Sequence, residues 1–335
     1  MRILIALLGF ILLTQTAHAG EVLDRVRQND SVRCSAPPEQ PGFAMPEGKT
    51  GYAGFDVEIC HAIAAAVLGD ASKIQFFPLP PAPRLAGLRD GTLDVLARDT
   101  PITLARYFDP DLVSAGDSFF TGVGFMVRSQ TSLRSLESLD GANLCMRRDP
   151  DTLRLLSIQM TTRGFLFRFT EFDSQAEAKR AFFSAKCDAL VGMVSDLATA
   201  RSRTDNPNYY RITASLMTLE SYGPVVLRRD AQWADIVRWT LRAMIGAESI
   251  NVSQLNIKDA VDRKDRSVRR LLGRDGNSWQ PLGLSNDWVE KVITQVGNYG
   301  EIFDRHLGTA TPMGLSRWPN DLWFRGGVLT SPAFP

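Results

Sequence analysis

Two different spacings of apolar residues alternate along the first part of the chain. Short apolar runs at 31–36, 73–78 and 93–97 predict buried strands. Apolar residues recur at helical spacing near 55–68, and a shorter helix is expected near 84–90. Strands that alternate with helices favour a parallel sheet joined by crossover helices. The first part of the chain therefore predicts an α/β lobe.

A second block with the same alternation follows. Its apolar runs predict strands at 142–147, 165–170 and 187–193, with helices between them. Ser174 and Glu177 form a capping-box signature, which places the start of one of these helices. This block predicts a second α/β lobe.

The chain is then expected to return to the first lobe. Residues 222–228 read as an extended segment, and helices are predicted at 231–247 and 286–307, the second with a break at Gly297–Gly300. Two crossings between lobes make a hinge, and a ligand cleft between the lobes follows.

We therefore expect an α/β fold of two lobes. Lobe 1 is predicted to comprise residues 20–125 and 224–335, including a C-terminal helical extension, and lobe 2 residues 126–223. A chain of 335 residues that is 44% hydrophobic can bury one large core or two moderate ones.

The N-terminus predicts secretion. A charged start at Met1–Arg2 precedes an apolar run at Ile3–Leu13 and the cleavage pattern Ala17–Ala19. The apolar run is shorter than the about 20 residues that a membrane-spanning helix needs. We expect a signal peptide at residues 1–19 and a soluble periplasmic protein that begins near Gly20.

The overall charge excludes one class of partner. The formal net charge is only +1, and no basic run interleaved with aromatic residues occurs. Nucleic acid is therefore not an expected partner.

Four cysteines in an oxidising compartment suggest disulfide bonds. Each of the pairs Cys34–Cys60 and Cys145–Cys187 falls inside one predicted lobe, which favours this pairing over the other two. Loops of this size add roughly 3–4 kcal/mol each to stability. Four buried free thiols are the alternative. Without a C-x-x-C motif, and with the mature histidines far apart, neither a metal nor another cofactor is expected.

Two sets of segments share their pattern with known proteins. The first set is 54–60, 90–95, 97–106 and 186–188, and the second is 232–241, 268–273, 283–288 and 296–303. The first set resembles family 3 extracellular solute-binding proteins. The second resembles the general L-amino-acid-binding proteins of ABC importers.

The resemblance implies a two-lobed periplasmic-binding-protein fold of type II, the Venus-flytrap fold. It implies a monomer that closes on an L-amino acid or a related carboxylate and delivers it to a membrane permease. It also implies a binding protein that needs no cofactor and is not an enzyme.

The resemblance also implies ligand contacts in lobe 1. Arg106 stands where the family pairs an arginine with the α-carboxylate, a geometry that the guanidinium group suits. Asp99 and Thr100 belong to the turn before it, and Phe43 and Tyr52 stand where aromatic residues line the side-chain pocket.

The sequence departs from the family pattern at several of these points. Pro101, which has neither an N–H nor a hydroxyl, occupies the expected Ser/Thr position. In lobe 2, Asp149, Pro150 and Asp151 occupy the turn expected to bind an anion, and Met193 stands in place of the acid that holds the ammonium group. Loss of one partner of a buried charge pair costs about 2–5 kcal/mol, or roughly 30-fold to several thousand-fold in affinity.

Three interpretations of the cleft remain open. In the first, Asp99 holds the ammonium group of an amino acid and Arg106 its carboxylate; a shifted alignment would let Asp196 serve instead. In the second, a different small solute binds, and an anion would suit Arg98, Arg106, Arg147 and Arg148. In the third, the protein is a sensor or a partner-binding module.

An enzyme is the alternative from another class, because periplasmic dehydratases and some peptidoglycan-cleaving proteins share this fold. Such an enzyme needs an acid–base carboxylate in the cleft, for which Asp99 and Asp149 are the candidates. No nucleophile elbow, H-E-x-x-H helix or phosphate loop occurs. The sequence therefore favours a binding protein.

Overall fold

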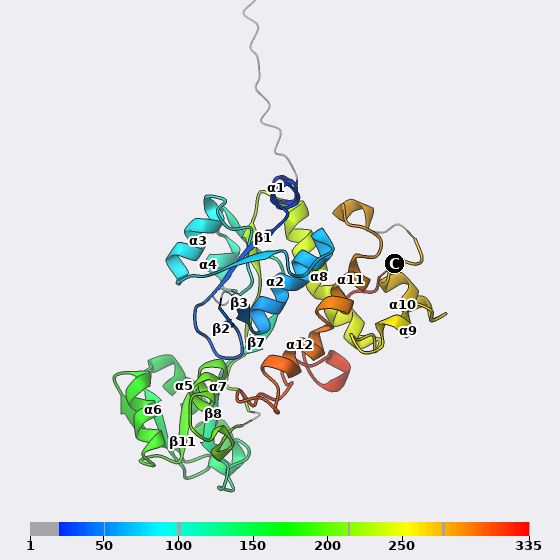
Figure 1. Ribbon diagram of the computed structural model, residues 1–335. Coiled ribbons are helices and arrows are strands. Elements are labelled where there is room, and N and C mark those ends of the chain that lie inside the picture. The colour runs from blue at the N-terminus through cyan, green and yellow to red at the C-terminus, as the bar shows by residue number, and fades with distance from the viewer. Residues whose placement is uncertain (1–19, 50, 99–101, 214, 277–278, 335) are drawn as a thin grey trace, which may run out of the picture.

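Two separate five-stranded sheets carry the fold, one in each lobe (Figure 1). The computed structural model describes residues 20–49, 51–98, 102–213, 215–276 and 279–334. The predicted signal peptide lies outside these residues. Within the described ranges no helix combines the length and the apolar character needed to cross a membrane.

The lobe 1 sheet joins strands from both ends of the chain. Its order is β4 (Ile74–Pro78), β1 (Val32–Ala36), β5 (Val95–Leu96), β14 (Val225–Leu227) and β6 (Leu112–Ser114). Strand β1 runs parallel to β4 and β5, whereas β14 is antiparallel to both of its neighbours. The helices of this part are α1 (Glu21–Asn29), α2 (Phe55–Leu68), α3 (Pro81–Arg89), α4 (Leu104–Tyr107) and α8 (Ala231–Ser249). A small hairpin pairs β2 (Met45–Glu47) with β3 (Gly51–Ala53).

The lobe 2 sheet has the order β10 (Arg168–Phe172), β9 (Asn143–Arg147), β11 (Ala189–Met193), β8 (Val123–Arg128) and β12 (Tyr210–Ile212). The first three strands are parallel, and β8 is antiparallel to β11 and β12. Its helices are α5 (Pro150–Arg163), α6 (Gln175–Phe183) and α7 (Val194–Ser202). The Ser174 side chain accepts a hydrogen bond from the Glu177 amide at the start of α6, as the capping-box signature predicts.

A two-stranded ribbon links the lobes. Strand β7 (Phe119–Thr121) pairs antiparallel with β13 (Glu220–Tyr222). Strand β8 follows β7 at once and belongs to the lobe 2 sheet, so the lobe boundary predicted at 125 falls inside β8.

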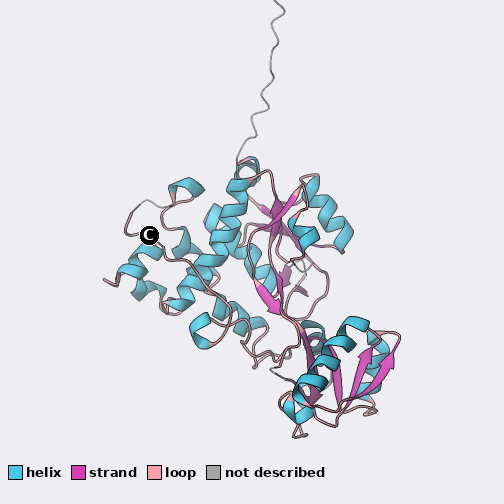
Figure 2. Cartoon of the chain, turned by 180° about the vertical axis from the view of Figure 1, so that it is seen from behind, coloured by secondary structure: helices cyan, strands magenta, loops and turns pink. Residues whose placement is uncertain are grey.

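The C-terminal part adds short helices to lobe 1 (Figure 2). They are α9 (Ile257–Ala260), α10 (Arg266–Leu271), α11 (Trp288–Gln295) and α12 (Tyr299–His306). The break predicted near Gly297 separates α11 from α12, where Asn298 and Glu301 form a capping box. Single 3₁₀ turns occur at η1 (Glu137–Leu139), η2 (Pro207–Tyr209), η3 (Gln280–Leu282) and η4 (Trp323–Arg325).

Each lobe has its own buried core and its own disulfide bond. The lobe 1 core continues into the C-terminal helices; Trp233 of α8 and Trp288 of α11 are both fully buried in it. The lobe 2 sheet buries a separate apolar cluster on each of its two faces. Cys34 pairs with Cys60, and Cys145 with Cys187, which confirms the predicted pairing.

Removal of the lobe 2 disulfide tests its contribution to stability. The bond closes a loop between residues 42 apart in sequence. Because a crosslink of this span restricts the unfolded chain, the Cys145→Ala/Cys187→Ala double variant should lose roughly 3–4 kcal/mol of unfolding free energy. Urea unfolding of the oxidised protein and the variant measures this difference. An unchanged unfolding midpoint would contradict it.

Candidate functional site

A hollow of about 370 Å³ opens at one end of the lobe 2 sheet. Its walls come from the ends of β9 and β11, the starts of α5 and α7, and the ribbon strand β13. Every residue that lines it lies between Val123 and Glu220. Among the described residues, lobe 1 therefore contributes none to these walls.

The order of elements explains why the hollow lies there. Strands β9 and β11 are parallel, and each is followed directly by a helix. The carboxyl ends of such strands and the helix N-termini meet at one edge, where α/β proteins commonly bind ligands. At the start of α5, however, Pro150 supplies no N–H group. The Asp149 side chain accepts a hydrogen bond from the Thr152 hydroxyl at 2.6 Å instead of from the helix backbone.

Carboxylates dominate the charge of the hollow. Of the residues that the structure describes, Asp149, Asp151, Asp196 and Glu220 line it together with a single guanidinium group, that of Arg147. The Arg147 side chain is 56% exposed, and its Nη2 lies 3.9 Å from Asp149 Oδ2. Four acids against one base give the lobe 2 wall a negative potential, which attracts an ammonium group and repels a carboxylate.

Two residues of the ribbon connect this wall with lobe 1. Burial raises the pKa of Glu220. The pKa of Tyr222 rises to about 12, chiefly through burial and then through Glu220, while Arg98 opposes the shift and Asp196 adds to it. The Tyr222 phenol is therefore protonated at neutral pH and lies within electrostatic reach of groups from both lobes.

Arg98 is held inside lobe 1. Its Nε donates to both carboxylate oxygens of Asp56, at 3.0 and 3.1 Å, and its Nη2 donates to Gln40 Oε1 at 2.6 Å. The guanidinium carbon lies 4.0 Å from the centre of the Phe43 ring and 5.9 Å from that of Tyr222. Both members of the Arg98–Asp56 pair are buried. Arg98 is thus a cation already neutralised by the protein.

The predicted ligand contacts are spread over several places. Phe43 is buried in lobe 1, where its ring contacts those of Phe55 and Phe119. Tyr52 packs against Phe76 and lines a different hollow of about 300 Å³ between the β2–β3 hairpin and α2. Arg147 lines the lobe 2 hollow.

The remaining predicted contacts belong to the turn before α4, to α4 itself and to Arg148. Arg106 belongs to α4. Asp99, Thr100 and Pro101 lie outside the described residues. Arg148, which the anion hypothesis uses, forms ion pairs with Glu171 and Asp173 at 3.6 and 3.1 Å.

The ribbon residues beside the hollow are not among the ligand contacts predicted from the sequence. Glu220 and Thr218 line the hollow, and Tyr222 adjoins it, yet they lie in or before the stretch predicted only as a return to lobe 1. The one available signal was position: polar residues at a crossing between lobes face the cleft that the crossing forms. Asp196, the alternative ammonium partner, lines the hollow, as does Met193, which stands in place of the expected acid.

Known proteins resemble this chain over most of its length. Residues 32–254 match the family model of bacterial extracellular solute-binding proteins, family 3. The general L-amino acid-binding periplasmic protein AapJ of Rhizobium johnstonii is 33% identical over 335 residues, covering 99% of this chain and 98% of that protein. The glutamate/glutamine/aspartate/asparagine-binding protein BztA of Rhodobacter capsulatus is 33% identical over 319 residues, covering 95% and 94%.

A solved structure extends the likeness to the fold. The ABC transporter/periplasmic binding protein from Brucella ovis with glutathione bound is 33% identical and has a TM-score of 0.74. The match covers 93% of this chain and 99% of that chain.

The buried Arg98–Asp56 pair generates a prediction about stability. Asp56→Asn leaves the Arg98 guanidinium buried without its carboxylate, so the variant should lose about 3–5 kcal/mol of unfolding free energy. Asp173→Asn is the matched control, because Asp173 is 82% exposed and pairs only with the exposed Arg148. Its loss should stay below about 1 kcal/mol. Equal unfolding midpoints in urea for both variants would contradict the assignment of Arg98 as a structural cation.

Proposed function

We propose, because this chain belongs to the bacterial extracellular solute-binding proteins of family 3, that it is the periplasmic solute-binding component of an ABC importer. The family is one of binding proteins, so the chain is a binding protein and not an enzyme. In the proposed cycle, lobe 2 turns on the ribbon, the cleft closes over a solute, and a membrane permease receives it. The proposal includes a signal peptide cleaved after residue 19 and a monomeric mature protein.

The observation that carries the proposal is the one-sided hollow. Among the described residues, its lining comes from lobe 2 and the ribbon alone. Such a half-site gains its remaining walls only when the two lobes approach, which ties binding to closure. The ribbon of β7 and β13 supplies the two crossings about which this motion can occur.

For the ligand, we propose an L-amino acid or a related small solute that presents an ammonium group to lobe 2. Asp149, Asp151, Asp196 and Glu220 supply the negative charge that favours this orientation. The ligand carboxylate then lies toward lobe 1, where the family resemblance assigns it to Arg106. Pro150 supports the same orientation, because it removes a backbone donor from the helix start that would otherwise bind an anion.

A ligand with only anionic groups is less well supported. Of the four arginines that it would use, Arg98 is neutralised by Asp56 and Arg148 pairs with Glu171 and Asp173. The Brucella ovis relative binds glutathione. Glutathione carries an ammonium group besides its carboxylates, so it is the second candidate ligand.

A ligand screen tests the proposed class. Thermal unfolding of residues 20–335 is followed with each of the twenty amino acids, glutathione, simple diamines and small dicarboxylates. A solute that binds only the folded protein raises the midpoint. We expect a rise with solutes that carry an ammonium group and none with dicarboxylates. No rise with any solute at millimolar concentration would contradict the proposal.

The acidic wall supplies the matched variants. Asp196→Asn should weaken the binding of an active ligand by about tenfold or more, since it removes part of the charge that faces the ammonium group. The control is Asp173→Asn, a lobe 2 carboxylate outside the lining of the hollow, which should leave affinity unchanged. Calorimetric titration measures both. Equal losses would mean that overall charge, and not the wall, determines binding.

The raised pKa of Glu220 predicts a pH dependence of binding. Only the ionised carboxylate attracts an ammonium group, so affinity should fall as the pH drops through the Glu220 pKa. The fall should begin above the ordinary glutamate range, because burial raises that pKa. Titrations from about pH 4 to pH 8 measure this profile. In Glu220→Gln the component of the fall that belongs to this residue should disappear; an identical profile would contradict its role.

A further inference from the structure

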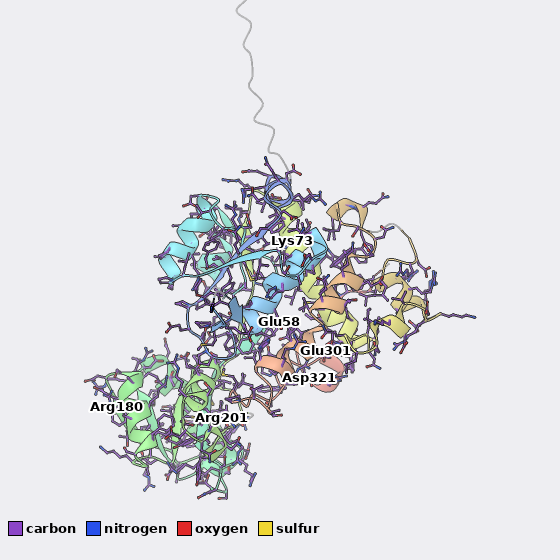
Figure 3. The ribbon with its side chains drawn as sticks, viewed as in Figure 1. Glu58, Lys73, Arg180, Arg201, Glu301 and Asp321 are labelled. Atoms are coloured by element: carbon purple, nitrogen blue, oxygen red, sulfur yellow. A yellow bond between two sulfur atoms is a disulfide. The ribbon has the colours of Figure 1, made fainter. Side chains whose placement is uncertain are left out.

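The C-terminal segment 308–325, which we call the strap, follows α12 and contacts lobe 1, the ribbon and lobe 2. It lies beyond residue 254, where the family match ends. Figure 3 labels Arg201 on the side of lobe 2 next to this segment and Arg180 on the opposite side. The strap therefore forms a third connection between the lobes, in addition to the two crossings of the chain.

Arg201 of α7 is the contact in lobe 2. Its Nη1 donates to the carbonyl oxygens of Pro312 at 2.5 Å and of Thr311 at 3.4 Å. Its other nitrogens bond within lobe 2, Nε to the Tyr210 carbonyl at 2.8 Å and Nη2 to Asn208 Oδ1 at 3.2 Å. The side chain spans the boundary between the lobe and the strap.

Water can replace the strap carbonyls as hydrogen-bond partners of Arg201. The residue is 6% exposed, and among the described residues its guanidinium group bonds to carbonyl and amide oxygens. Burial lowers its pKa. Because burial costs the guanidinium group part of its hydration, exposure to water on separation from the strap recovers part of that loss, so the contact with the strap carbonyls can break when lobe 2 moves.

Asn320 fastens the strap to the ribbon. Its Oδ1 accepts from the Phe120 amide at 2.6 Å, and its Nδ2 donates to the Phe120 carbonyl at 2.8 Å. The side chain thus pairs with β7 as a neighbouring strand would. Asn320 is 3% exposed, so these bonds are shielded from water.

Arg317 fastens the strap to lobe 1. Its Nη2 donates to both carboxylate oxygens of Glu248 in α8, at 2.9 and 3.0 Å. The guanidinium group also lies over the rings of Tyr299 and Phe303 of α12. A bidentate, largely buried ion pair is a firm anchor. The strap therefore stays with lobe 1 when lobe 2 moves.

Where the strap faces the ribbon and lobe 2, some buried hydroxyl groups lack hydrogen-bond partners among the described residues. Between the strap and lobe 2 lies a hollow of about 20 Å³ lined by Thr121 and Thr213. Both hydroxyls are buried, and neither has a hydrogen-bond partner in the part of the chain that the structure describes. Unsatisfied polar groups favour separation, because water can then reach them.

The position of Arg201 converts hinge motion into a break. Helix α7 begins beside the ribbon, where the Val194 amide donates to the Gly122 carbonyl at 2.9 Å. Arg201 lies seven residues further along the helix, about 10 Å away. For this contact to break, lobe 2 must turn away from the strap as the cleft closes; the guanidinium group then passes beyond hydrogen-bond reach of Thr311 and Pro312, which stay with lobe 1.

We propose that the strap is a latch that holds the cleft open until a solute binds. Contacts present only in the open form lower the population of the closed form in the absence of ligand, and they reduce apparent affinity by the same factor. The proposal rests on the proposed hinge closure but not on the identity of the solute. The exposed contact from Arg203 Nη2 to the Glu39 carbonyl, at 3.1 Å, acts in the same direction and contributes little.

Small-angle X-ray scattering of residues 20–335 without ligand tests the latch. Arg201→Met removes the contact while keeping a long apolar side chain. Its radius of gyration should decrease relative to that of the native protein, because more molecules are closed. Arg180→Met is the matched control, since Arg180 is 72% exposed and pairs only with Glu177; its radius should equal that of the native protein.

A second variant protects the test from a folding defect. Arg201 also bonds within lobe 2, so its loss can disturb that lobe; Asn320→Ala instead loosens the strap at the ribbon and should decrease the radius in the same direction. Circular dichroism verifies that each variant is folded. An unchanged or larger radius in folded Arg201→Met and Asn320→Ala would overturn the latch.

The two proposals fail in different ways. Scattering without ligand reports on the latch even if no solute binds, in which case only the proposed function fails. With an active solute, Arg201→Met should bind roughly tenfold more tightly, because a tenfold larger closed population raises the apparent affinity by the same factor. Unchanged scattering together with solute binding would overturn the latch alone.

Discussion

The pairing of β7 with β13 is the constraint on which the rest of the structure depends. It brings both crossings of the chain side by side, so the two sheets can turn relative to each other without either being broken. The same ribbon carries Glu220 into the wall of the hollow and places Tyr222 beside Arg98. Hinge and ligand wall are therefore parts of one element. A substitution that changes the charge of this wall at Glu220 therefore also changes the ribbon that forms the hinge.

Charge differs between two described parts of the molecule, the neutralised Arg98 of lobe 1 and the acidic wall of lobe 2. Asp56 and Gln40 occupy the guanidinium group of Arg98, which the Phe43 ring covers on one side. The lobe 2 wall, in contrast, carries four carboxylates and one guanidinium group. In the proposed complex, the acidic wall favours a zwitterion that lies with its ammonium group toward lobe 2.

The sequence predicted those features that depend on local periodicity and on residue chemistry. The two α/β blocks, the return to lobe 1, the break before α12 and both disulfides follow from spacing along the chain. The arrangement of the cleft does not, because it depends on side chains from distant segments. Arg98 looks like a ligand contact until Asp56, 42 residues earlier, is found against it. Glu220 carries no local signal, since its role arises from where the ribbon places it.

The strap, which lies beyond the part of the chain that matches the family model, acts in the proposed latch on the two-lobed fold before it. A hinge with two crossings has an open–closed balance set by the ribbon and by the ligand. A third connection, fixed to lobe 1 by Arg317 and to lobe 2 by Arg201, adds a free-energy difference between the open and closed forms that depends on neither the ribbon nor the ligand. Because the described side-chain hydrogen bonds of Arg201 go to residues outside the lining of the hollow, that difference can change without changing which solute fits. Ligand choice and the threshold for closure are then determined by separate residues.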